Sequence, residues 1–147
     1  MTDRCSAYII IGGQLRAEEF LVLAGLIAAE SLSADWDGPW FTPDDYIEGQ
    51  PLSLKAREVT GGQFDELEAW CEARGLPFVR WCAAYPGSWC AERVVFTGEG
   101  EPVSFISDDD DRVVIDAARL ESLGSMEAVR AHFADGNFLV PPLVLTA

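Results

Sequence analysis

The stretch Ala7-Tyr8-Ile9-Ile10-Ile11-Gly12-Gly13-Gln14-Leu15 decides the fold, because its second half occurs twice in the chain. Gly12-Gly13-Gln14-Leu15 recurs as Gly61-Gly62-Gln63-Phe64, 49 residues farther along. Each copy follows a strand-like run, residues 7–11 in the first and 54–60 in the second. Glycines are favoured where a chain turns into a helix, so the repeat predicts a duplicated strand–turn–helix unit.

A helical pattern follows each copy, over residues 15–30 and 64–74. In the second helix Phe64, Leu67, Trp70 and Cys71 share one stripe and acidic residues face outward, which is typical of an amphipathic helix. The first helix is apolar nearly all round between Phe20 and Ile27, so we expect it to be the more deeply buried of the two.

Strand candidates over residues 32–36 and 77–85 follow the two helices and complete the order β-α-β-β-α-β. This order predicts an α+β fold of the ferredoxin-like type, an antiparallel sheet with both helices on one face. The first of these strands is short and runs into Asp35-Trp36-Asp37-Gly38-Pro39, so an α+β meander stays open as the alternative.

The rest of the chain extends this core. A strand over residues 89–97 is expected to pair with 77–85 through Pro86-Gly87. A two-residue turn would set Arg80 opposite Arg93, whereas a three-residue loop would set Arg80 opposite Glu92 and Cys82 opposite Cys90. A hairpin is expected to join residues 103–106 to residues 113–115. Two short helices are expected over residues 117–123 and 126–134, and an edge strand over residues 138–145. We therefore divide the chain into a core, residues 1–100, and an elaboration of the same domain, residues 101–147.

The composition excludes several functions. The 147 residues include 25 acids and 10 bases, for a net charge of −15. The acids are spread along the chain, with a net charge of −9 over residues 1–75 and −6 over residues 76–147. A nucleic-acid binder or a protein that docks on anionic membranes needs a basic surface, so direct binding to either is not expected. An acidic field of this kind either serves solubility, which is the commoner case, or attracts a basic partner.

Catalytic, metal and cofactor motifs are not found in the sequence. Cys5, Cys71, Cys82 and Cys90 have no metal-binding or redox spacing, and we expect four free thiols. His132 is the single histidine and has no nucleophile elbow near it, so a surface or partly packed histidine is expected. The N-terminus shows no signal peptide, which predicts a cytoplasmic protein. The lack of catalytic and metal-binding motifs predicts a protein without enzymatic activity, cofactor or metal.

Two acidic segments are the candidate partner-binding sites. Residues 35–46 hold four acids and four aromatics, punctuated by prolines and a glycine. They predict either a satellite core or an interaction loop whose aromatics anchor in a partner. Residues 108–111 are four consecutive aspartates without the EF-hand pattern, which predicts a solvated turn. The candidate residues are Asp35, Trp36, Asp37, Trp40, Phe41, Asp44, Asp45, Asp108, Asp109, Asp110 and Asp111.

These features predict a non-enzymatic inhibitor that binds a basic protein and occupies its nucleic-acid-binding surface. In size, charge and lack of catalytic motifs the chain resembles the small acidic inhibitors of phages and mobile elements, such as anti-CRISPR and antirestriction proteins. This resemblance rests on no motif and assigns no residue a role. Two alternatives stay open: an immunity protein against a basic toxin nuclease, and a small-ligand binder or enzyme with a pocket on the sheet face. A deep pocket around His132 or the cysteines would favour the second alternative.

Overall fold

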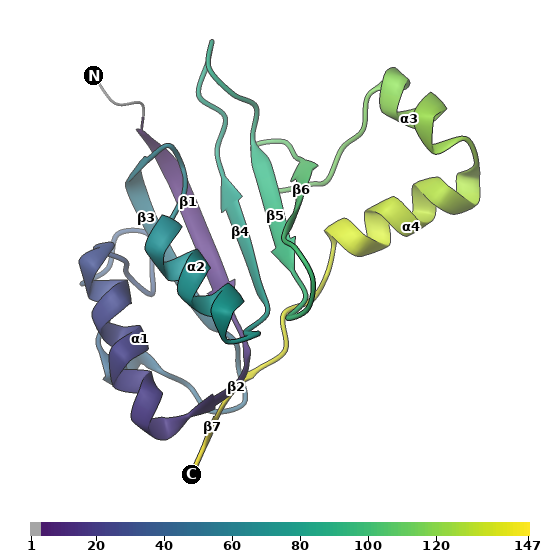
Figure 1. Cartoon of the computed structure of the whole chain (residues 1–147). Helices are drawn as coiled ribbons and strands as arrows, with labels where there is room; N and C mark the ends of the chain where they lie inside the picture. The colour runs from purple at the N-terminus through teal and green to yellow at the C-terminus, as the bar shows by residue number, and fades with distance from the viewer. Residues whose placement is uncertain (1–3) are drawn as a thin grey trace.

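A computed structural model describes residues 4–147 and shows a mixed α+β fold around one five-stranded sheet (Figure 1). The strand order is β3-β1-β4-β5-β6, and every neighbouring pair is antiparallel. The strands are β1 (Arg4–Ile11), β3 (Leu52–Thr60), β4 (Phe78–Cys82), β5 (Glu92–Phe96) and β6 (Val103–Ile106).

Helices α1 (Ala17–Ala29) and α2 (Asp65–Ala73) lie together on one face of this sheet, as the repeat predicts (Figure 1). Alternation along β1 explains the packing, because Ala7, Ile9 and Ile11 point to this face and are fully buried. They pack in the main core with Leu23 and Ile27 of α1 and with Leu67 and Cys71 of α2. The first helix is less buried than expected, since Leu21 and Val22 are exposed.

Helices α3 (Ala117–Leu123) and α4 (Met126–Gly136) form a hairpin that extends beyond the β5–β6 side of the sheet (Figure 1). A second, smaller core of Val79, Val95, Phe105 and Val113 lies on the sheet face opposite α1 and α2, with Phe133 of α4 packed against it. Side chains of β3, β1 and β4 on this same face therefore line a hollow instead of a core.

The C-terminus returns to the first glycine pair. Strand β7 (Leu143–Thr146) pairs in parallel with β2 (Gly13–Arg16), a short strand between β1 and α1. The first Gly-Gly-Gln therefore enters a strand, whereas the second forms a turn before α2. A Cβ atom on Gly12 would come within 1.8 Å of the Pro141 carbonyl oxygen, so close backbone approach is what requires glycine here. The two copies share strand–helix order but not conformation.

Two expected strands do not form. At residues 32–36 only Ser33 makes bridges, to Lys55 and to Trp40, because the following aspartates, glycine and proline turn the chain away. At residues 113–115 only Val113 pairs, with Ser107. Without the first of these strands, the ferredoxin-like strand order is not confirmed. In the described part of the chain no helix is long and apolar enough to cross a membrane.

The β4–β5 hairpin adopts neither of the two expected registers. Arg80 lies opposite Val94, and Cys82 lies opposite Glu92. A bridge between Tyr85 and Trp89 closes a three-residue loop over residues 86–88, whereas the three-residue alternative placed this loop over residues 85–87. The Tyr85 and Trp89 ring centroids are 5.2 Å apart. Cross-strand charge pairing is still satisfied, because Arg80 reaches Glu92 diagonally, with Nη2 3.1 Å from Oε1.

Candidate partner-binding surface

The hollow on the open sheet face has a volume of about 460 Å³. Its floor consists of side chains that alternate with the core positions of their strands, Tyr8 and Ile10 of β1 and Trp81 of β4. Ser53 and Lys55 of β3 line it from the sheet edge. Three aromatic or apolar groups thus lie at the base of a concave surface, which is the usual composition of a binding site.

The Tyr8 side chain lies at the centre of a polar cluster in this floor. Its ring stacks on Trp81 at 5.8 Å, and its hydroxyl donates a hydrogen bond to the Asp111 carboxylate. Arg93 donates from Nη1 to the Tyr8 hydroxyl at 3.0 Å and to Asp111 at 3.1 Å, and from Nε to the Gly136 carbonyl at 2.7 Å. Burial, together with the Asp111 carboxylate, holds the pKa of Tyr8 well above its usual range. The cluster ties β1, β5, the acidic turn and α4 together.

The four aspartates divide into two that hold the turn and two that face outward. Asp108 accepts hydrogen bonds from the backbone N–H groups of Asp110 and Arg112 and from Arg112 Nε at 2.8 Å, and these bonds lower the pKa of Asp108. Asp111 has φ 59° and pairs with Arg93. Asp109 and Asp110 are exposed at the rim of the hollow, with the Asp110 side chain 80% exposed. The predicted solvated turn is therefore also one wall of the hollow.

Residues 35–46 are partly packed in the core and partly exposed to solvent. Phe41 is buried in the main core, and Tyr46 packs on Phe20 and donates to the Leu143 carbonyl at 2.6 Å. Phe41 therefore serves the core, and its side chain is not available to a partner. Trp40, in contrast, is 71% exposed, although it directly precedes Phe41. One aromatic anchors the loop, and the next one projects from it.

Trp36 and its acidic neighbour are held by one arginine. The Arg57 guanidinium lies 5.4 Å from the centre of the Trp36 ring. The same guanidinium makes two hydrogen bonds to the Asp37 carboxylate, at 2.8 and 3.0 Å, which lower the pKa of Asp37. Asp37 is thus internally neutralised, and the half-buried Trp36 is oriented toward the hollow that it lines.

The two candidate segments meet in space. Trp36 lines the same hollow as Asp109, Asp110 and Asp111, although more than 70 residues separate them in the chain. A second hollow of about 440 Å³ adjoins it at Ser53 and is lined by three further acids, Asp35, Asp44 and Asp45. Within residues 4–147, Asp35, Asp44, Asp45 and Asp109 have no ion-pair partner. The acidic–aromatic surface, as we call Trp36, Trp40 and these unpaired acids with Asp110, therefore carries uncompensated negative charge.

The floor residues were missed by the sequence analysis. Tyr8 and Trp81 lie at strand positions that alternate with buried ones, which is a signal for the opposite sheet face and not for a site. Lys55, the single lysine, donates to the Ala34 carbonyl at 3.1 Å and to Ser53 Oγ at 3.0 Å, so it fastens the loop to β3. Only the strand pairing shows that these residues share one surface with the acids.

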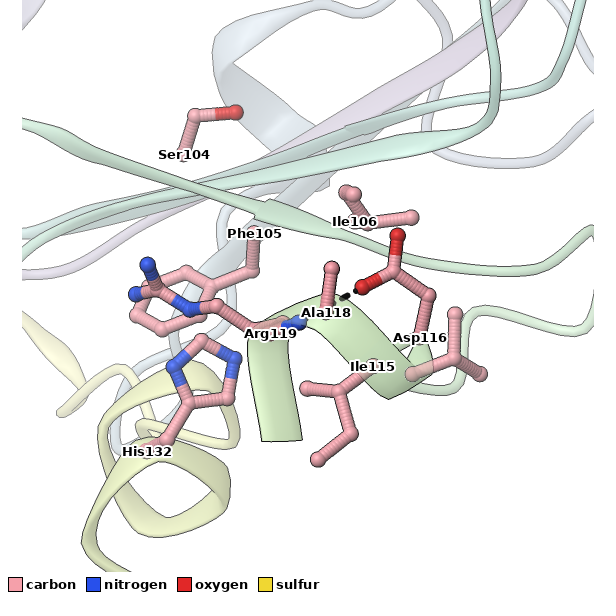
Figure 2. A pocket seen from close by; sticks show the side chains of 9 residues that line it. Ser104, Phe105, Ile106, Ile115, Asp116, Ala118, Arg119 and His132 are labelled. Carbon is pink, nitrogen blue, oxygen red and sulfur yellow. Dashed lines mark hydrogen bonds between the residues drawn. The ribbon is translucent and has the colours of Figure 1, made fainter. Parts of the chain in front are cut away.

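A separate cleft of about 450 Å³ lies between β6 and the α3–α4 hairpin, and Figure 2 shows it with His132 at one side. The His132 ring packs on Phe105 at 5.1 Å and on Phe133 at 5.9 Å, as expected of a partly packed histidine. Ser104 Oγ donates to Glu92 at 2.6 Å, and Asp116 accepts from the backbone N–H of Arg119. The hydroxyl and the carboxylate of this cleft thus hold other partners, and no nucleophile–histidine–carboxylate chain is assembled.

All four cysteines have free thiols; Cys90 is exposed and the other three are buried. Burial raises the pKa of Cys71 to about 12 and that of Cys82 to about 11, so neither is a ready nucleophile. In the part of the chain that the structure describes, no group of three or more His, Cys, Asp or Glu side chains could hold a metal ion.

Comparison of the chain with protein-family models, with curated proteins and with solved structures returned no match.

Proposed function

We propose that the protein binds a basic protein partner through the acidic–aromatic surface. The observation that supports this most directly is the convergence of Trp36 and the aspartate turn on one hollow. Trp36 and the aspartate turn line one hollow although they are distant in sequence, and the exposed Trp40 lines a neighbouring hollow that shares Trp36 and Lys55 with the first. Interfaces commonly combine an aromatic anchor with surrounding charges that select the partner.

The two kinds of residue would contribute differently to such a complex. Trp40 would bury most of its ring in the partner and slow dissociation, as aromatic hot spots do. The unpaired carboxylates at positions 35, 44, 45 and 109 would attract lysine and arginine side chains and speed association. Four other aspartates would contribute less, because their charges are already paired within the chain: Asp37, Asp108, Asp110 and Asp111.

The partner class follows from the charge. We propose that the partner is a nucleic-acid-binding effector or a nuclease. Its phosphate-binding lysines and arginines would contact the carboxylates of the acidic–aromatic surface in place of nucleic-acid phosphates. Occupation of that surface would make the protein a non-enzymatic inhibitor. An immunity protein against a basic toxin nuclease would use the same contacts, so the identity of the captured partner distinguishes the two.

Affinity capture with the wild-type protein and with variants of the acidic–aromatic surface tests this proposal. Wild-type protein, Trp40→Ala, and the double variant D109N/D110N would be used for affinity capture from the source cells, with E99Q/E101Q as the matched control. Glu99 and Glu101 are exposed acids of the β5–β6 turn, so the control loses the same charge elsewhere. Circular dichroism would first confirm that each variant is folded.

The captured partner would then be purified and its binding measured directly. We expect a basic protein whose association slows steeply as ionic strength rises from 0.1 to 1 M, where the Debye length falls from about 10 to about 3 Å. Trp40→Ala should weaken binding by about 30-fold or more, mainly through faster dissociation, which corresponds to about 2 kcal/mol. Nucleic acid should compete with the protein. A partner that is acidic, salt-insensitive, or retained equally by all baits would contradict the proposal.

A further inference from the structure

We propose that the cleft between β6 and the α3–α4 hairpin binds a small carboxylate with an aliphatic body, such as a medium-chain fatty acid. The cleft is separate from the acidic–aromatic surface, since the two share no lining residue. Its volume of about 450 Å³ lies in the range of small-molecule sites. It would be a second binding function in addition to partner binding.

The walls of the cleft are mostly apolar, and two of their side chains, Ile106 and Val114, are exposed, whereas Phe105 is buried. Phe105, Ile106, Val114 and Ile115 line it, and Ile106 is 53% exposed although it lies on a sheet strand. Helix α3 has no buried residue, so its contacts within the chain leave its apolar side chains in solvent. A concentration of exposed apolar side chains of this kind marks a binding surface more often than chance exposure does.

Two cationic or donor groups lie at one side of these walls. Figure 2 shows the Arg119 guanidinium projecting toward the Phe105 and His132 rings, with the Asp116 carboxylate at the opposite side. Six of the chain's other arginines make ion pairs, whereas Arg119 makes none within residues 4–147. Asp116, the one carboxylate of the lining, accepts a hydrogen bond from the Arg119 backbone and not from its side chain. An unpaired guanidinium offers a carboxylate two parallel hydrogen bonds.

The long-range charge of this region also permits an anion. Residues 113–147 contain two bases and four acids, so they contribute only −2 to the net charge of −15. The remaining charge lies on residues 1–112, and salt screens it beyond about 10 Å at 0.1 M. The single carboxylate of the lining, Asp116, already accepts a backbone hydrogen bond at the start of α3, whereas the Arg119 guanidinium has no ion pair in the described part of the chain and lies beside the His132 ring. Charge complementarity therefore selects a carboxylate over an amine.

The test compares three probes of equal chain length: octanoate, 1-octanol and octylammonium. Binding to the full chain would be followed by calorimetry and by amide chemical shifts of the residues that line the cleft. We expect octanoate to bind at least tenfold more tightly than 1-octanol, and octylammonium to bind most weakly. Equal binding of octanoate and octylammonium, or no shift in the cleft at millimolar octanoate, would overturn the proposal.

Variants identify the contacts. Arg119→Gln should weaken octanoate binding at least tenfold, whereas Arg130→Gln should not change it, because Arg130 is an exposed arginine of α4 outside the lining. Ile106→Glu should abolish binding by placing an acid in the apolar wall, and circular dichroism would confirm its fold. Equal losses for the two arginine variants would show nonspecific attraction and refute the site. A dimer in sedimentation that Ile106→Glu dissociates would assign the cleft to a second copy and refute it as well.

Discussion

Replacing Glu68 by alanine should destabilise the protein by about 3–5 kcal/mol, because it removes the more deeply buried of the two carboxylates that pair with the buried Arg80. Arg80 lies on β4, faces the main core and is 3% exposed. Its Nε lies 3.2 Å from Glu68 Oε1, and its Nη1 donates to the Gly62 carbonyl at 3.0 Å. The ion pair therefore joins α2 and the second glycine turn to the sheet.

The magnitude follows from what each group would lose. Removing one member of a buried pair typically costs about 3–5 kcal/mol, since the remaining charge is stranded. Glu68 Oε2 also accepts from the Phe64 N–H at 2.7 Å at the start of α2, and losing that acceptor adds about 1–3 kcal/mol if water cannot replace it. Glu92 still pairs with Arg80 but is 35% exposed, so it offsets part of the loss. These opposing effects keep the expected value within the range for one broken pair.

Urea unfolding followed by circular dichroism would measure the change, provided that the slope with denaturant stays constant. The double variant E68A/R80M should be more stable than Glu68→Ala alone, because methionine removes the stranded charge and keeps an apolar body in the core. Glu18→Ala is the control, since its pair with Arg16 is exposed and should contribute less than about 1 kcal/mol. A Glu68→Ala variant within about 1 kcal/mol of wild type, or a double variant less stable than the single one, would refute this reasoning.

Three further outcomes are expected. Gly61→Ala should lower the free energy of unfolding by about 1–2 kcal/mol, because alanine is strained at the positive φ of this position. Gly62→Ala should lower it by about 1–3 kcal/mol more, because the added Cβ would lie 2.7 Å from the Cys82 Cβ. Urea unfolding of the two variants would measure the difference, and equal stabilities would show that this close contact is irrelevant. Tyr8 should ionise above the ordinary tyrosine range, so its contribution to stability should be complete below pH 10 and decline as the pH rises further, which absorbance titration of wild type against Tyr8→Phe would measure. A thiol reagent should react at once with Cys90 in the folded protein and with four thiols after unfolding without reductant; a count below four would indicate a disulfide among the buried cysteines (Cys5, Cys71 and Cys82).

For the repeated glycine pair, the sequence pattern predicts the order of strands and helices correctly but not the conformation of each copy. The strand–glycine–helix order is correct in both copies, and helices α1 and α2 share a sheet face as expected. The two Gly-Gly-Gln segments nevertheless differ in conformation, because the first is paired with β7 from the far end of the chain. A pairing partner more than 120 residues away leaves no trace in the local pattern.

The candidate site shows the same division. Acids and aromatics in residues 35–46 and 108–111 mark both segments as unusual in the sequence, yet nothing local separates Phe41, which is buried, from Trp40, which is exposed. The two neighbours differ because the loop is held against the core from one side only. The cleft beside His132 is likewise built by residues of β6, α3 and α4 that no spacing rule connects.

The α+β class, the order of most strands and helices, and the acidic surface could be predicted from the amino-acid sequence. These follow from short-range periodicity and from composition, which act within a few residues or over the whole chain. Three features became visible only in the folded chain: the strand order, the β4–β5 register, and the position of Trp36 beside the aspartate turn. These depend on which distant segments pair, and that choice is made by packing of whole faces against one another, a competition that no local stretch records.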